Sequence, residues 1–271
     1  MEDVVLARAR YEELDRAGQK VRIRLNSTAV RIVGDDHGVD VGYLGHADRS
    51  LHRVRARHVV LACFNMLIPY VLAGLDERQS AALRLNVKAP LVYSNVLVRN
   101  WEPWVRLGVH EIYGVASHHS RVKLDYPVAM GGYLNSRQPS EPMVLHMVHV
   151  PVVPGIVEPR SELRAARGLL MNATFADHEA AIRTDLSRML GPGGFDDRRD
   201  ILAITVNRWS HGYAWGLNTL VDDEGEAHAA MKLARRPVGR VTVANSDSNW
   251  SAYAHAAIDA AYRAVGELKS G

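Results

Sequence analysis

The C-terminal segment of the chain places a buried strand, a polar turn and a long alanine-rich helix in direct succession. The apolar run 241–244 ends at Asn245-Ser-Asp247, whose side chains can cap a helix. Free N–H groups at the start of such a helix favour an electron-rich oxygen. Small side chains then recur at helical spacing and let another backbone or a ring approach closely: Ala256, Ala257, Ala260, Ala261 and Ala264. On spacing alone, an ordinary terminal helix with an alanine packing face is the simpler explanation.

The same segment resembles the C-terminal flavin-binding signature of FAD-dependent amine oxidases. In that family a strand that ends in an acidic residue precedes a Trp-Ser-Gly-Tyr turn and an alanine- or glycine-rich helix. Trp250-Ser-Ala-Tyr253 stands in that place here. The Asn245-Ser-Asp247 variant and the run Tyr253–Asp259 are closer still to the spermidine dehydrogenase branch. The similarity to that branch runs from about residue 7 to the end of the chain.

The sequence lacks the glycine-rich turn with which the two-domain flavoproteins of this family begin. That Gly-x-Gly-x-x-Gly turn, between a strand and a helix, holds the pyrophosphate on backbone N–H groups. The nearest candidate is Gly191-Pro-Gly-Gly194, which lacks a third glycine in place and is followed by Phe195-Asp-Asp, so we interpret it as a connector. We therefore expect the C-terminal part of such an enzyme, one that binds FAD weakly or not at all by itself.

The predicted fold class is α/β (α+β-like), an incomplete two-domain flavoprotein of the amine oxidase type. Residues 20–62 predict a β-meander of three antiparallel strands, at 20–33, 39–44 and 51–62. The last of these changes from alternating to continuous apolar residues, which indicates that its end enters a doubly covered sheet.

The middle of the chain predicts a mixed sheet with covering helices. Apolar, β-rich runs occur at 89–99, 125–134, 143–153 and 201–209, and residues 161–190 predict one or two helices that end at the glycines after Leu190. We expect residues 1–75 and 236–271 to form the remnant of an FAD-binding domain. Residues 76–235 would form the substrate-binding domain.

The resemblance also implies functional residues. Tyr213 and Tyr253 match the two aromatic rings that amine oxidases often place on the substrate side of the flavin, and Trp215 is a weaker third candidate. The N–H of Ala254 would meet flavin O2, and Asp247 would lie near the ribityl chain or pyrophosphate. From the residues alone, helix capping and core packing explain the same positions. The full predicted cofactor set is Val30, Ala62, Cys63, Ser246, Asp247, Trp250, Ala254 and His255.

One departure from the family concerns the lysine that many amine oxidases hold, through water, near flavin N5. The matching place falls at about Ser94 or Asn95, and Lys88 lies upstream of it. Proton handling is therefore unassigned. The difference favours a dehydrogenase that passes its electrons to another acceptor over an oxidase.

Charge and cysteine content exclude other classes. The 33 basic residues barely exceed the 30 acidic ones and form no dense tract, which argues against nucleic acid as a partner. The single Cys63 excludes an internal disulfide and cysteine-based metal sites. The first residues lack the apolar core of a signal peptide or membrane anchor, so the cytoplasm is the expected compartment.

Histidines offer a rival interpretation as a metal or haem site. The pairs are His118 with His119 and His146 with His149. Residues one or three apart on a strand point to opposite faces, so these pairs make no ready ligand set, and we expect no metal.

Taken together, the sequence predicts FAD-dependent oxidation of an amine, a polyamine such as spermidine, by hydride transfer to flavin N5. The expected partners are the small-molecule amine and a separate nucleotide-binding half or an electron acceptor. The alternative is a non-catalytic remnant or a binding and assembly module without a cofactor.

Overall fold

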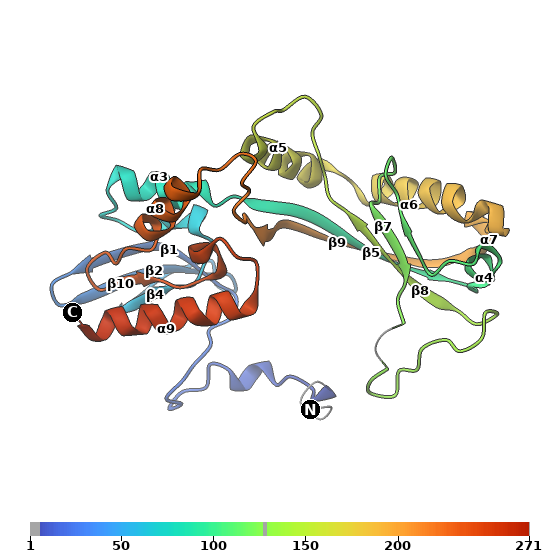
Figure 1. The fold of residues 1–271 in the computed structure, drawn as a ribbon. Helices are drawn as coiled ribbons and strands as arrows, with labels where there is room; N and C mark the ends of the chain where they lie inside the picture. Colours follow the sequence, from blue (N-terminus) through green and yellow to red (C-terminus); the bar gives the residue numbers. More distant parts are fainter. Residues whose placement is uncertain (1–5, 127–128, 271) are drawn as a thin grey trace. The chain divides into compact units, whose positions relative to one another are not determined.

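The computed structural model describes residues 6–126 and 129–270, which divide into two compact units (Figure 1). Unit 1 comprises residues 88–126 and 129–212 with Leu6 and Ala7, and unit 2 comprises residues 8–87 and 213–270. The units differ from the predicted domains because α3 (Glu77–Leu85) and α8 (Glu224–Ala234) pack on each other within unit 2. The assignment of FAD binding and of substrate binding to separate domains stays a prediction.

Unit 2 begins with the predicted meander. Its strands β1 (Ser27–Asp35), β2 (Gly38–Gly45) and β3 (Leu51–Ala56) pair antiparallel in that order. The first turn closes on Asp35, whose Oδ1 accepts the backbone N–H groups of His37 and Gly38. The meander is therefore confirmed, with its first strand starting later than the sequence indicated.

The third predicted strand breaks after Ala56, and its apolar end enters another sheet. There β4 (Val59–Leu61) pairs parallel with β10 (Val241–Val243). This pair and the helices around it share one hydrophobic core, in which Leu83, Val241 and Val243 are buried. The change from alternating to continuous apolar residues thus marks a real change of sheet. The remaining helical elements of unit 2 are Tyr11–Glu13, Asn65–Leu67, α2 (Ile68–Val71), Ser246–Asn249 and α9 (Ala254–Ser270).

Unit 1 is built on a five-stranded sheet in the order β6-β7-β8-β5-β9. Its strands are β5 (Lys88–Val98), β6 (Glu111–Tyr113), β7 (Arg121–Leu124), β8 (Met143–His149) and β9 (Ile201–Ala214). The pairs β6–β7, β7–β8 and β5–β8 are antiparallel. Hydrogen bonds from Arg99 N to Asp200 O and from Asn207 Nδ2 to Tyr93 O place β9 antiparallel to β5 as well. The mixed α/β class is confirmed, but the strand directions within this sheet are not mixed.

One predicted strand is wrong. The run 125–134 was expected to be extended, whereas β7 ends at Leu124, and the described residues of 125–134 lie outside the strands. Gly131 and Gly132 adopt φ of +64° and +83°, a conformation that interrupts a strand. Val128 and its neighbour Pro127 lie outside the described residues.

Helices cover one face of this sheet. Buried residues alternate along β5, and Val96 and Val98 pack with Leu186 and Leu190 of α6 (Phe175–Leu190). A capping box between Thr174 and Asp177 starts α6. The helices predicted at 161–190 are confirmed as α5 (Pro159–Asn172) and α6, and the shorter elements are α4 (Glu102–Leu107), Gly191–Gly193 and α7 (Asp197–Asp200).

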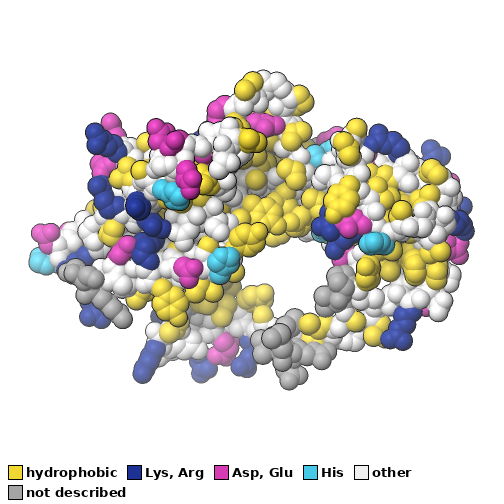
Figure 2. Space-filling view, in the orientation of Figure 1, with side chains coloured by type: hydrophobic (Ala, Val, Ile, Leu, Met, Phe, Trp, Pro, Cys, Tyr) yellow, Lys and Arg dark blue, Asp and Glu magenta, His cyan; other side chains and the backbone are white. Residues whose placement is uncertain are grey.

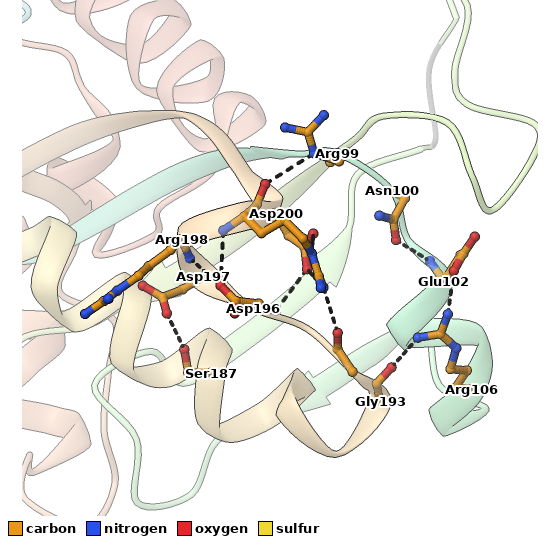
Figure 3. A network of polar contacts seen from close by, with 12 residues as sticks. Arg99, Asn100, Glu102, Arg106, Ser187, Gly193, Asp196, Asp197, Arg198 and Asp200 are labelled. Carbon is orange, nitrogen blue, oxygen red and sulfur yellow. Dashed lines mark hydrogen bonds and ion pairs between the residues drawn. The ribbon is translucent and has the colours of Figure 1, made fainter.

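A polar network joins the end of β5 to α4 and α7 (Figure 3). At its centre Asp200, which is 1% exposed, accepts hydrogen bonds from the N–H of Asp196 and from the guanidinium of Arg199. Arg106 binds Gly193 O and Glu102. These charged groups bind one another and backbone groups. We therefore interpret the network as structural: it connects the end of β5 with α4 and α7.

The surface and the helices give two further findings. Basic and acidic side chains are interspersed over the face drawn in Figure 2. Within the described ranges, no helix combines the length and the apolar character needed to cross a membrane.

Candidate cofactor site

The parallel pair β4–β10 directs two chain segments to the same edge. Cys63 and Asn65 follow β4, and Asn245 and Asp247 follow β10. The backbone N–H of Asn65 donates to Asp247 Oδ2 at 3.0 Å, and both residues are buried. In open α/β sheets, ligands bind outside the carboxyl ends of parallel strands. This edge is therefore the place in unit 2 where a cofactor site is expected.

The turn after β10 is held by side-chain caps. Asn245 Oδ1 accepts the N–H and the hydroxyl of Ser248, both at 2.9 Å, and Asn245 Nδ2 donates to Cys63 O. The same asparagine thus closes the turn and ties it to the end of β4. Burial raises the pKa of the Cys63 thiol, and the charge of Asp247 raises it further. Cys63 is therefore a protonated thiol at neutral pH.

Trp250 reverses the chain between this turn and α9. It adopts φ +46° and ψ 43°, a left-handed conformation that is strained for a bulky side chain. Its N–H donates to Asp247 O at 3.0 Å, and its side chain is 5% exposed. Burial of a large aromatic side chain offsets the backbone strain. Trp250 therefore combines a strained backbone conformation with a buried side chain at the point where the chain reverses.

Helix α9 starts on the surface and then packs inward through its alanines. Ala256, Ala260 and Ala264 are 4%, 1% and 0% exposed, so this face lies against unit 2 itself. Arg263 from the same helix donates to Val243 O of β10. The packing-face explanation of the alanine spacing thus holds for these three residues. The helix start, by contrast, is open to solvent.

Exposure separates the predicted residues into three groups. Asp247 and Trp250 are buried, and Cys63 and Ser246 are half-buried. The others are exposed: Val30, Ala62, Tyr213, Tyr253, Ala254 and His255. The exposed residues are open to solvent, whereas Asp247 and Trp250 contribute to the shape of the turn. The contact of any of these residues with a cofactor stays a prediction.

The two proposed aromatic residues lie at the surface of unit 2. Tyr253 is 67% exposed and stacks on His255, with ring centroids 5.5 Å apart and planes 19° apart. Tyr213 is 51% exposed. That the rings of Tyr213 and Tyr253 lie on either side of one substrate molecule stays a prediction. Trp215 is 9% exposed, and its Nε1 donates to Asp222 at 2.9 Å, so this weaker candidate has a structural role.

Asn65 is a residue that the predicted site omitted. It is fully buried, and neither atom of its side-chain amide has a hydrogen-bond partner among the described residues. A buried amide without partners is costly, so such a group calls for an explanation. The sequence signal was its position: a polar residue in the loop that follows the apolar strand β4.

The strand that matches the family's lysine lies in unit 1. Lys88 and Ser94 are buried. Asn95 points to the face that α6 does not cover, where its Oδ1 lies 3.1 Å from Nδ1 of His146 and the ring of Tyr93 is 5.0 Å from that imidazole. Burial lowers the pKa of His146. This strand therefore presents neutral polar groups on its uncovered face.

Comparison with known proteins identifies the fold. No family model and no curated protein matches the sequence. Among solved structures, putrescine oxidase bound to putrescine matches with a TM-score of 0.61 and 16% identity, over 94% of this chain and 50% of that one. Cyclohexylamine oxidase from Brevibacterium oxydans IH-35A matches with a TM-score of 0.55 and 17% identity, over 89% and 47%. The chain therefore shares its fold with about half of each of these two amine oxidases. It spans about half the length of each of these structures.

Proposed function

We propose that this chain is the C-terminal part of an FAD-dependent enzyme that oxidises amines, and that its substrate is a polyamine such as spermidine. One observation carries the proposal: the strand, the capped turn with its left-handed Trp250 and the helix α9 occur in a fold that matches putrescine oxidase and cyclohexylamine oxidase. Both matched proteins are named for the oxidation of an amine.

The start of α9 is the part of the chain that suits a flavin. Bound FAD would supply the hydride acceptor. Ala254 is the exposed first residue of this 17-residue helix, and N–H groups of a first turn lack helical partners, so they favour an electron-rich oxygen. Tyr253, stacked on His255, offers a ring face beside it. Asp247 and Asn65 hold the turn from within.

The nucleotide-binding part of the proposed enzyme lies outside this sequence. We propose that it comes from another segment of a longer chain or from a separate chain. Two observations support this: the matched structures are about twice as long, and the sequence has no Gly-x-Gly-x-x-Gly turn. The pair β4–β10 is a two-stranded sheet in the described structure, and Val60 at the middle of β4 is 40% exposed.

A reconstitution experiment tests the proposal. The purified chain is mixed with FAD, alone and with the glycine-rich N-terminal half of a polyamine dehydrogenase, and its absorption is recorded anaerobically before and after spermidine. We expect yellow protein and spermidine-dependent bleaching only in the reconstituted sample. FAD binding without bleaching by spermidine, putrescine or cyclohexylamine would reject amine oxidation. Absence of FAD binding in the reconstituted sample would favour the alternative, a binding or assembly module.

A pair of proline variants isolates the backbone contact. Proline is tolerated at the first position of a helix, where it removes an N–H that has no helical partner. Ala254→Pro should therefore preserve the fold and weaken FAD binding in the reconstituted sample by about tenfold, the size of one lost hydrogen bond. Glu224→Pro changes the first position of α8 in the same unit and serves as the matched control. Equal FAD affinity of the two variants would rule out the Ala254 contact.

A further inference from the structure

Unit 1 contains a cavity of about 670 Å³ whose lining belongs entirely to that unit. Three segments form it: the loop 114–120 between β6 and β7, residues 149–152 at the end of β8, and residues 169–178, which span the end of α5 and the start of α6. A volume of this size lies within the range of small-molecule sites, roughly 300–1,000 Å³. The turn before α9 belongs to unit 2, so the cavity and the proposed cofactor site share no residue.

Imidazole rings form part of the polar lining. His118 and His149 stack with ring centroids 3.6 Å apart and planes 16° apart. His119 packs edge-on against His118 at 5.0 Å, and its Nδ1 and backbone N–H both bind the buried Asp185, at 2.9 and 2.8 Å. The buried pair fixes the loop that carries His118. The stack is therefore a positioned, flat surface beside the cavity.

Hydrogen bonds fix the tautomer of His149. Its Nδ1 lies 2.6 Å from His118 O, and a carbonyl can only accept, so Nδ1 carries the proton. Burial lowers the pKa of His149 to about 4, which keeps the ring neutral at pH 7. The Nε2 atom of a neutral ring protonated on Nδ1 is an acceptor. His149 thus presents a hydrogen-bond acceptor and no spare donor.

The lining contains other polar groups besides His149. Ser120 Oγ donates to Val148 O at 3.3 Å. His178, which is 5% exposed, has an Nε2 atom without a partner in the described structure. Burial lowers the pKa values of His118 and His178, so both are neutral as well. His149 Nε2 is therefore the ring atom of the lining whose role as an acceptor is fixed by a hydrogen bond, and the Ser120 hydroxyl has its proton engaged within the protein.

The remaining lining and the nearby charges define the rest of the ligand. Val152 and Leu169 are 61% and 56% exposed, so apolar surface borders the cavity. Arg188 binds Ser117, and Arg208 binds Ala173 O, so two guanidinium groups hold the wall. The carboxylates of Asp177 in the lining and of Asp185 beside His119 balance these two positive charges, so the surroundings of the cavity favour a neutral ligand.

We propose that this cavity binds a neutral aromatic molecule with one hydroxyl or N–H donor, of the phenol or indole class. Its ring packs against the His118–His149 stack and the apolar wall, and its donor meets His149 Nε2. The site is independent of the proposed oxidation of amines.

Calorimetric titration of the whole chain with three probes tests the proposal. p-Cresol carries the ring and the donor, 4-methylanisole carries the same ring with the donor methylated, and benzylamine is a cation. We expect p-cresol to bind about tenfold more tightly than the ether, because one hydrogen bond is lost, and more tightly than the amine. Equal affinity of p-cresol and the ether, tighter binding of benzylamine, or no binding of p-cresol would overturn the proposal.

Variants locate the site. His149→Phe keeps a ring and removes the acceptor, so it should abolish the preference for p-cresol over the ether. His146→Phe, on the other face of β8, is the matched control and should leave that preference unchanged. Leu169→Glu changes a wall residue whose side chain is largely exposed, and it should lower the affinity for both neutral probes. Unchanged p-cresol binding in Leu169→Glu would place the ligand elsewhere.

Discussion

Replacement of Asp247 tests whether this residue holds the cofactor turn or only lies near it. Its Oδ2 accepts the N–H of Asn65 at 3.0 Å, and the two residues are 1% and 0% exposed. Asp247→Ala leaves that N–H buried without a partner. A loss of this kind costs about 1–3 kcal/mol, and we expect about 2 kcal/mol for this variant. Asp247→Asn keeps an acceptor oxygen and should cost about 1 kcal/mol or less.

The effect is local, so the assay must be local too. Amide hydrogen exchange, followed by NMR, should show the Asn65 N–H exchanging roughly 30-fold faster in Asp247→Ala, which corresponds to about 2 kcal/mol. Urea unfolding should show the same loss for the transition of unit 2. Asp259→Ala is the matched control because Asp259 is an exposed residue of α9.

Two outcomes would refute this reasoning. If Asp247→Ala and Asp259→Ala unfold within about 0.5 kcal/mol of each other, the buried hydrogen bond does not stabilise the turn. The second outcome is that Asp247→Asn keeps the stability of the natural chain but loses FAD binding in the reconstituted sample. In that case the carboxylate contacts the cofactor, and Asp247 is not buried in the form of the chain that binds FAD.

Three further predictions concern stability. Trp250→Gly should be less destabilising than Trp250→Ala by about 1 kcal/mol in urea unfolding, because glycine tolerates the observed φ of +46°; the opposite order would contradict the left-handed assignment. Asp200→Ala should lower the unfolding free energy of unit 1 by about 2–3 kcal/mol, because the Asp196 N–H and the Arg199 guanidinium lose their acceptor; an effect on unit 2 alone would be inconsistent with this. Burial holds the pKa of His149 at about 4, below its ordinary value of 6.5, so the stability from the neutral ring is complete above pH 6.5 and is lost as the pH falls toward 4. After allowance for partial exposure, the loss between pH 7 and pH 5 should be about 1 kcal/mol, and His149→Phe should show a smaller loss over the same range.

Local signals near the C-terminus were sufficient to predict the elements there. Asn245 caps the turn, and the alanine-rich helix follows where the pattern indicated it. Comparable signals start α3 and α8, where Asp76 and Asp223 accept the N–H groups of Gln79 and Glu226. These helices were not assigned, because a capping residue before a short, weakly periodic segment is a common pattern in loops as well. Their packing on each other is a long-range property that no local pattern contains.

Contacts between distant segments explain what sequence reasoning missed in the two sites. The stack of His118 on His149 joins residues 31 positions apart, and it arises because the loop after β6 folds over the end of β8. The argument that neighbouring histidines point apart was sound for His146 and His149, which lie on opposite faces of β8. That argument did not consider contact between a histidine in a loop and a histidine on a strand. Within the described residues, no group of three or more His, Cys, Asp or Glu side chains is arranged so that it could hold a metal ion.

The alanine face of α9 shows how the structure changes the interpretation of a motif. The spacing allowed either a ring or a backbone to approach, and Ala256, Ala260 and Ala264 are buried within unit 2. A helix face that packs on its own sheet cannot also bind a cofactor. The part of the motif that stays open to solvent is the start of the helix, where Tyr253 and His255 stack beside Ala254, and the proposed flavin contact is limited to this part. The small residues therefore act indirectly: they let α9 lie close to β10, and this packing places the helix start at the carboxyl edge of the parallel strands.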